Sequence, residues 1–321
     1  MHRRTFLAAM GSAIAASAFP ALTVPARASG IEEILRAELD SGRACGANAA
    51  AIEGTLSRLA RTRPPGPGKT VVIDMPSQHL AAYRDGVTEL ESRVVVGDPS
   101  WQTPDLDTRI VNVRYNPTWT VPESILKARG WRSKLDSSPE YFRNLNFLVE
   151  LDGAMVDPFT AAGSGSRVGR FVQQPGEGNA LGQVKFPLAD GDAIYLHDTN
   201  DYGAFGEDSR ALSHGCVRVE RAVELAAWVM DIGLAQAQDY IYGDDRREHT
   251  GFGTVRVVTT YFTAWPDANG NVLYYPDIYG RDGASGGYCG EASAPAWGSG
   301  YAQGSALQDN APPQEVIIYA N

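Results

Sequence analysis

The stretch Ile194-Tyr195-Leu196-His197-Asp198-Thr199, followed after a polar loop by Leu212-Ser213-His214-Gly215-Cys216-Val217-Arg218-Val219, decides how this chain of 321 residues is interpreted. The first part is typical of an apolar strand that ends at His197, and the second contains a glycine turn that leads to Cys216. A cysteine attacks as the thiolate, and a neighbouring imidazole favours that anion. The pattern therefore predicts an acyl-transfer site with Cys216 as nucleophile and His197 as general base.

The turn before Cys216 is expected to supply donors for an oxyanion. Gly215 permits a backbone that aims successive N–H groups at one point, so we predict an oxyanion hole made of the amides of His214, Gly215 and Cys216, with Ser213 in support. His214 is two residues from Cys216, so it could contact the thiol or only shape the turn. We assign His197 as the base and His214 as a supporting residue.

Two other interpretations of the same residues stay open at this point. His197, His214 and Cys216 could hold a catalytic zinc ion, since three protein ligands suffice, but no nearby His-Glu or Cys-x-x-Cys pair supports a metal site. Alternatively, the thiol could be merely buried and the histidine merely hydrogen-bonded. We expect neither metal nor cofactor.

The first residues predict export. Arg3-Arg4 precede an uncharged, Ala-rich run to about Leu22, followed by Ala26-Arg27-Ala28, which has the order of a signal peptide with an A-x-A cleavage site. The arginine pair resembles the twin-arginine signal, which implies a periplasmic protein. The alternative is a membrane anchor, but Pro20 and the small residues leave little continuous apolar length. We assign residues 1–28 as signal peptide and expect no membrane span after cleavage.

Charge limits the possible partners. The whole chain carries −10, and removal of residues 1–28 takes away three arginines and no acidic residue, which leaves −13. A strongly acidic exported protein is a poor candidate for binding nucleic acid or anionic membrane surfaces.

The chain has three cysteines, Cys45, Cys216 and Cys289. In an oxidising compartment two can pair, and the remaining thiol is a candidate nucleophile. Cys45 and Cys289 lie outside the segment that looks catalytic, so either they form a tethering disulfide or both are isolated thiols.

The chain divides at Arg63-Pro64-Pro65-Gly66-Pro67-Gly68, which can continue neither helix nor strand. Residues 29–68 are predicted to hold two helices, 31–40 and 47–61. Residues 69–243 are predicted to form the catalytic domain, which opens as an antiparallel sheet with a hairpin at Asp85-Gly86. The predicted strands are 70–74, 79–84, 88–96, 109–113, 184–186 and 193–196, and the predicted helix is 222–230.

Residues 119–183 interrupt this pattern. Only a helix at 123–128 is predicted there, and an insertion of this size is either a functional lid or a surface excursion with its own small core. Residues 244–282 are predicted to be a strand extension that includes strand-like residues at 254–262 and 273–276. Residues 283–321 form a Gly/Ala/Ser/Pro-rich tail with a possible strand at 316–319.

The segment from His197 to Arg218 resembles the signature of the L,D-transpeptidase (YkuD-type) family, a histidine followed after a loop by [S/T]-H-G-C. Arg218 stands where the shorter form of the motif has asparagine. The resemblance covers roughly residues 50 to 281, and it points to the larger subgroup with an inserted capping subdomain. The wider matches are Val72-Ile73-Asp74-Met75-Pro76, Val94-Val95-Val96-Gly97, Asn116-Pro117-Thr118-Trp119-Thr120-Val121-Pro122, Asn179-Ala180-Leu181-Gly182, Tyr261-Phe262-Thr263-Ala264-Trp265 and Pro276-Asp277-Ile278-Tyr279-Gly280-Arg281.

The resemblance implies a mainly β sandwich with α-helices, a partly helical capping insertion and short N-terminal helices. It implies that Cys216 attacks the peptide bond after meso-diaminopimelate in a tetrapeptide stem and releases D-alanine. An amine of a second peptidoglycan stem then takes the acyl group, which gives a 3→3 cross-link, and a carbapenem can acylate the same cysteine. Arg218, Trp119 and Tyr195 are candidates for substrate contact.

Members of the larger subgroup usually also carry a long N-terminal scaffold and a peptidoglycan-binding module, whereas here two short helices are expected, so the wall-anchoring partner is open. Two alternative functions remain. Water could replace the acceptor amine, which would make the protein an L,D-carboxypeptidase, or the protein could bind the wall without catalysis. The intact His197 and Cys216 favour an enzyme.

Overall fold

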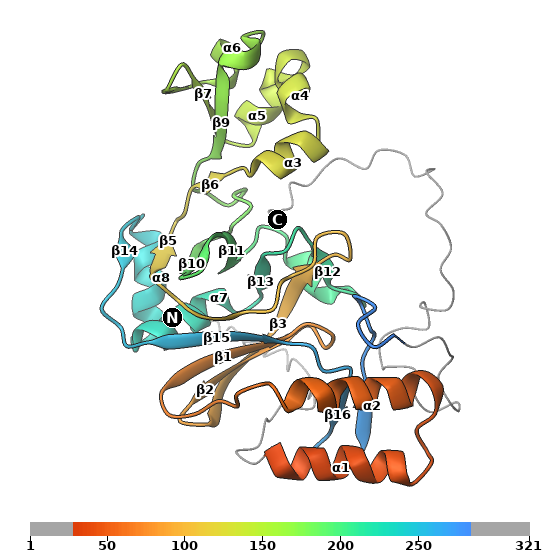
Figure 1. Cartoon of the computed structure of the whole chain (residues 1–321). Coiled ribbons are helices and arrows are strands. Elements are labelled where there is room, and N and C mark those ends of the chain that lie inside the picture. The colour runs from red at the N-terminus through yellow and green to blue at the C-terminus, as the bar shows by residue number, and fades with distance from the viewer. Residues whose placement is uncertain (1–27, 284–321) are drawn as a thin grey trace, which may run out of the picture.

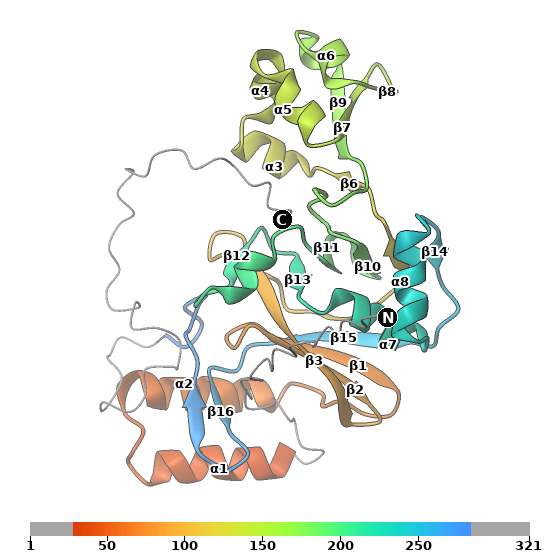
Figure 2. The same cartoon turned by 180° about the vertical axis from the view of Figure 1, so that it is seen from behind.

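The structure is a computed structural model that describes residues 28–283, apart from the side chains of residues 28, 29 and 191–193. The predicted signal peptide, Cys289, the C-terminal tail and the predicted strand at 316–319 lie outside this range. Figure 1 shows a central body of strands, a helical pair at one end and the inserted subdomain at the other, and the view from behind in Figure 2 gives the same arrangement.

The body opens with the predicted antiparallel strands β1 (Lys69–Asp74), β2 (His79–Arg84) and β3 (Val87–Gly97). Asp85 and Gly86 join β2 to β3 with φ values of 52° and 81°. Two consecutive positive φ values match the tight hairpin turn that the Asp-Gly pair favours. The prediction of this hairpin is confirmed.

Strand β3 joins two halves of one eleven-stranded sheet, whose order is β14-β5-β10-β11-β13-β3-β2-β1-β15-β4, with β12 beside β3. Its first part pairs with β2 and its last residues pair with β13 and β12, so the sheet changes direction along this strand. The remaining strands are β4 (Asp107–Arg109), β5 (Val113–Tyr115), β10 (Val184–Leu188), β11 (Gly191–His197), β12 (Ala211–Ser213), β13 (Val217–Val219), β14 (Glu248–His249) and β15 (Val255–Thr260).

Both halves of the sheet bury their apolar side chains in one aliphatic cluster, the main core. Val71 of β1 and Val257 of β15 meet Val184 of β10 and Val217 of β13 there, together with helix α7 (Ala222–Met230) and Ala237 of α8 (Leu234–Tyr242). Two sheet halves that share one core form a sandwich-like arrangement. The expectation of a mainly β fold with helices is confirmed.

Two predictions about this sheet are wrong. The expected strand 109–113 is split between β4 and β5, because the chain crosses there from one sheet half to the other and makes only an isolated bridge between Ile110 and Leu188. The expected domain boundary at residue 243 is also misplaced, because β15 pairs in parallel with β1 inside the main sheet.

The insertion is a small subdomain with its own sheet, in the order β6-β9-β7-β8, and its own aromatic core. We call this cluster, which includes Trp131, Phe142, Phe147 and Phe171, the insertion core. The sequence predicted only α3, since the other elements are short. The elements are β6 (Trp119–Thr120), α3 (Glu123–Ala128), α4 (Trp131–Ser137), α5 (Pro139–Asn144), β7 (Phe147–Leu151), β8 (Ala154–Val156), α6 (Pro158–Ala161), η1 (Gly165–Arg167) and β9 (Val168–Gln173).

The two N-terminal helices are present as α1 (Ala28–Asp40) and α2 (Gly46–Leu59). They pack against a hairpin of β16 (Ala264–Pro266) and β17 (Val272–Tyr274). β17 overlaps the strand-like residues 273–276 of the sequence, whereas β16 was not predicted. Cys45, directly before α2, is half of a disulfide, whereas Cys216 carries a thiol. No helix among the described residues has the length and apolar character needed to cross a membrane.

Candidate active site

Strands β11 and β13 place the predicted site residues on one face of the sheet. They pair in parallel, with Leu196 opposite Val217 and His197 opposite Arg218. Side chains alternate along a strand, so Leu196 and Val217 enter the main core while the residues beside them face the other way. Tyr195, His197, Cys216 and Arg218 therefore share the opposite face, and neighbouring strands lie only ~4.8 Å apart.

His197, at the end of β11, has the tautomer that a general base needs. Its side chain is completely buried, and its Nδ1 lies 2.5 Å from the carbonyl oxygen of Asp198. A carbonyl only accepts hydrogen bonds, so Nδ1 carries the proton and Nε2 has the lone pair. Among the described residues Nε2 has no hydrogen-bond partner, which leaves this atom available to take a proton from the thiol.

The charge state of the pair differs from the expectation. Burial raises the pKa of Cys216 to about 11. Hydrogen bonds from Tyr195 and the positive charges of Lys185 and Arg218 lower this pKa, but burial has the larger effect. Burial, followed by the charges of Arg218 and Lys185, lowers the pKa of His197 to about 3. The resting site is therefore a neutral thiol beside a neutral imidazole. Burial disfavours both charged forms, so the imidazole acts on the thiol during the attack and not by holding a thiolate at rest.

Asp198 and its neighbours fix the end of β11. Its carboxylate accepts hydrogen bonds from the hydroxyl of Tyr202 at 2.5 Å and from the amide of Gln183 at 2.8 Å. Gly182 has a φ of +59°, and a Cβ there would lie 2.4 Å from the Asp198 carboxylate. Only glycine allows this approach, which explains the glycine of the Asn179–Gly182 segment. Burial raises the pKa of Asp198.

The catalytic turn, residues 213–216, is held by its own hydrogen bonds. The hydroxyl of Ser213 donates to the carbonyl of Cys216 at 2.6 Å and accepts from the amide of Gly215 at 3.1 Å. The Gly215 amide is therefore engaged inside the turn, which leaves the Cys216 amide as the stronger candidate for an oxyanion donor. Gly215 itself is required by its φ of +110°.

A loop of residues 97–103 holds this turn from outside. The amide of Asp98 donates to the carbonyl of Ser213 at 2.8 Å. The Trp101 ring stacks on His214 with centroids 4.9 Å apart, and the Thr103 hydroxyl donates to the carbonyl of Gly215 at 2.9 Å. His214 thus contributes to the shape of the turn, consistent with a supporting role.

The three candidates for substrate contact have different surroundings. Tyr195 contacts the thiol of Cys216, and the Lys185 ammonium lies 3.7 Å from the centre of its ring. Arg218 is completely buried beside His197 in the strand register, with Asp201 at 3.6 Å. Trp119 is only 1% exposed and packs against Trp131 in the insertion core. The expectation that Trp119 contacts substrate is therefore wrong for this conformation.

Sequence reasoning missed Lys185, Asp198 and Thr103. Lys185 lies opposite His197 in the pairing of β10 with β11, and an alternation count along both strands could have found it. Asp198 directly follows His197 in the sequence. Thr103 had no local signal, because it meets the turn only through the fold. In the described part of the chain, no three His, Cys, Asp or Glu side chains are grouped to hold a metal ion.

Comparison with known proteins identifies the family of the chain. The family pattern described as YkuD, L,D-transpeptidase catalytic domain, matches residues 68–258. A Haemophilus influenzae protein named "Putative L,D-transpeptidase" is 35% identical over 220 residues, which are 66% of this chain and 44% of that protein. The chain thus spans less than half the length of this curated relative.

Solved L,D-transpeptidases are also similar to this chain. One from Mycobacterium smegmatis shares 14% identity over 61% of this chain and 59% of its own, with a TM-score of 0.29. L,D-transpeptidase 3 from Mycobacterium tuberculosis shares 14% identity over 61% and 62%, with a TM-score of 0.29. The YkuD pattern matches more than half of the 321 residues of the chain. The chain therefore belongs to the YkuD family of L,D-transpeptidase catalytic domains.

Proposed function

We propose that this protein is a peptidoglycan L,D-transpeptidase that forms 3→3 cross-links through an acyl-enzyme on Cys216. The observation that carries the proposal is the buried Nε2 of His197, which has no hydrogen-bond partner within residues 28–283 and lies on the sheet face that also holds the thiol. The donor is a tetrapeptide stem, the acceptor is an amine of a second stem, and the released product is D-alanine.

In the first half-reaction, His197 Nε2 takes the thiol proton as Cys216 Sγ attacks the carbonyl carbon before the terminal D-alanine. General-base transfer in the attack avoids a separate, buried thiolate. Backbone amides of the turn, with that of Cys216 foremost, stabilise the oxyanion. The C–N bond then breaks, and His197 returns the proton to the amine of the departing D-alanine.

In the second half-reaction, the acceptor amine attacks the thioester carbonyl and gives its proton to His197. The C–S bond breaks, the new amide forms, and the thiol recovers its proton from His197. Water in place of the amine gives L,D-carboxypeptidase activity through the same acyl-enzyme, so the acceptor decides between the two reactions.

We also propose that residues 1–28 direct export by the twin-arginine route and that the enzyme acts in the periplasm on peptidoglycan stems. Export is supported by the order of charged, apolar and small residues in this segment.

Product analysis tests the proposal. Mature protein is incubated with a disaccharide tetrapeptide, with and without a second stem, and the products are followed by mass spectrometry. A dimer that is lost in Cys216→Ala supports the transpeptidase. Tripeptide alone indicates the hydrolase, and the absence of any product contradicts both enzymes and leaves a wall-binding protein.

A further inference from the structure

A short segment after β17, residues 276–282, contacts both the N-terminal helices and the loop that clamps the catalytic turn. We call it the C-terminal strap. Its own shape is fixed around the carboxylate of Asp277, which accepts the Tyr261 hydroxyl at 2.5 Å, the Arg281 amide at 2.8 Å and the Asp282 amide at 2.9 Å. The strap is therefore a preformed turn.

The helical side of the strap is anchored by Arg58 of α2. Its guanidinium donates to the carbonyls of Tyr261 at 3.0 Å and Arg281 at 3.2 Å, and it forms an ion pair with Asp282. The Asp282 side chain is 3% exposed, so this pair is largely desolvated. A desolvated pair with additional carbonyl bonds fixes orientation more firmly than a surface pair.

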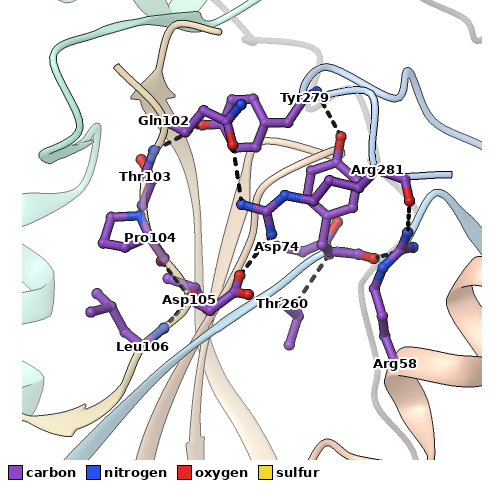
Figure 3. Close-up of polar contacts among 12 residues, drawn as sticks. Arg58, Asp74, Gln102, Thr103, Pro104, Asp105, Leu106, Thr260, Tyr279 and Arg281 are labelled. Atoms are coloured by element: carbon purple, nitrogen blue, oxygen red, sulfur yellow. Dashed lines mark hydrogen bonds and ion pairs between the residues drawn. The ribbon is translucent and has the colours of Figure 1, made fainter. Parts of the chain in front are cut away.

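The other side of the strap reaches the 97–103 loop. The Tyr279 hydroxyl donates to the Gly97 carbonyl at 2.8 Å and accepts from the Thr103 amide at 3.2 Å. Arg281 adds contacts to Asp105 at 2.7 Å and Gln102 at 3.4 Å. Figure 3 shows Tyr279 and Arg281 extending toward these residues, with Arg58 on the far side of the strap.

The Tyr279 hydroxyl bridges the two ends of a tightly closed loop. A Cβ on Gly97 would lie 2.1 Å from the Trp101 carbonyl, so the loop folds directly back onto its own start. Burial raises the pKa of Tyr279, which keeps its hydroxyl protonated and able to donate and accept at once. The ring is held in place by stacking on Tyr261, with centroids 5.6 Å apart.

Thr103 links the 97–103 loop to the catalytic turn through hydrogen bonds. Its completely buried hydroxyl accepts from the Gly97 amide at 2.9 Å and donates to the Gly215 carbonyl at 2.9 Å. The Gly215 carbonyl and the Cys216 N–H belong to one planar trans peptide, so they point in opposite directions. A hydrogen bond that fixes the carbonyl therefore fixes the direction of the Cys216 N–H.

We propose that Tyr279 is a positioning residue that, through Thr103, aims the Cys216 amide at the oxyanion of the acyl-transfer reaction. This inference rests on the proposed function. It assigns to the C-terminal strap a part in acyl transfer, because the strap holds the loop whose Thr103 fixes the orientation of this donor.

Two reactions of the same thiol separate the positioning role from a structural one. Acylation by a carbapenem forms an oxyanion, whereas alkylation by iodoacetamide does not. In Tyr279→Phe we expect the second-order rate constant of acylation to fall by about tenfold, less than the ~10²-fold loss typical of a deleted oxyanion donor. The alkylation rate constant should stay within about twofold of wild type, since it requires only the thiol and its base.

The matched control is Tyr274→Phe. Tyr274 is also buried, and its hydroxyl has no hydrogen-bond partner among the described residues. Both rate constants should remain unchanged in this variant. Equal acylation rates in Tyr279→Phe and wild type, or an equal loss in both reactions, would overturn the inference. Failure of wild type to react with the carbapenem would instead count against the proposed function.

A second pair of variants applies the same test if Tyr279→Phe folds poorly. Thr103→Val removes the hydroxyl that links Gly97 to Gly215, and Thr103→Ser retains it. We expect the ratio of the acylation rate constant to the alkylation rate constant to fall by at least tenfold in Thr103→Val, because oxyanion stabilisation is weakened. The ratio should recover in Thr103→Ser. Both rate constants are measured on the purified folded protein, because unfolded chain is alkylated but not acylated, and equal ratios in the two variants would contradict the inference.

Discussion

Cys216 and Val217 are adjacent in the sequence, but they pack into different hydrophobic clusters. Val217 enters the main core, which is built mainly of aliphatic side chains from both sheet halves. Cys216 enters the insertion core, which is rich in aromatic residues from the inserted subdomain. The boundary between the two clusters therefore runs through the plane of β11 and β13.

Substitutions in the main core should therefore change the stability of the protein, whereas substitutions around Cys216 should change the reactivity of its thiol. The main core contains no group that the proposed mechanism uses, whereas Cys216 packs in the same cluster as the insertion core and is 2% exposed. We therefore expect the inserted subdomain to control access to the thiol. The two faces of one strand pair should thus respond differently to substitution.

The largest difference is expected between two neighbours on β11. His197→Ala removes the general base, so acylation of Cys216 by a carbapenem should fall by about 10²–10⁴-fold with little change in the melting temperature. Leu196→Ala, on the opposite face, should lower the free energy of unfolding by about 2–5 kcal/mol and leave the acylation rate per folded molecule near wild type. Stopped-flow kinetics and urea denaturation measure the two quantities.

A wild-type acylation rate in His197→Ala would remove His197 from the mechanism. A loss of acylation in folded Leu196→Ala that matches His197→Ala would show that the two faces are not independent.

The pH dependence of alkylation comes next in size. A raised pKa for Cys216 and a lowered pKa for His197 mean that both groups are neutral near pH 7, so the thiolate fraction increases as the pH rises toward about 11. The iodoacetamide rate constant should therefore rise about tenfold per pH unit between pH 7 and 9. A plateau from pH 5 to 8 would instead indicate a resting thiolate and imidazolium pair.

The smallest expected effect on reactivity concerns the inserted subdomain, residues 119–183. Phe142 is completely buried in the insertion core against Trp131 and Phe147, and Phe186 is equally buried in the main core. Each Phe→Ala change should cost about 3–5 kcal/mol. Only Phe142→Ala should raise the alkylation rate of Cys216 severalfold without denaturant, because it loosens the subdomain that covers the thiol.

Phe186→Ala serves as the matched control, since it should lower the urea midpoint of the whole sheet and leave the alkylation rate of the folded protein near wild type. An equal increase of the alkylation rate in both variants would mean that the insertion does not control access to Cys216.

Much of the site could be predicted because its signals are local. The strand that ends at His197 and the glycine turn before Cys216 lie within short stretches of sequence, and the helix at Ala222–Met230 has the predicted bounds. Alternation along β11 would also place Tyr195 and His197 together. The motif therefore identifies the nucleophile and the base without the fold.

The remaining features depend on contacts that short stretches do not contain. Thr103 bonds Gly215 across 112 positions, and Tyr279 bonds Gly97 across 182 positions. The neutral state of the thiol follows from burial under a subdomain whose short strands had no clear alternation. Trp119 was misassigned for the same reason, since its neighbours in the insertion core include Phe147, far along the chain.

The most direct test of the central claim is the mass of the protein after reaction with a carbapenem, followed by peptide mapping. The account predicts one covalent adduct on Cys216, formed by wild type, formed far more slowly by His197→Ala and absent in Cys216→Ala. An adduct that persists in Cys216→Ala, or a wild-type protein that forms none, would contradict a cysteine acyl-enzyme at this site.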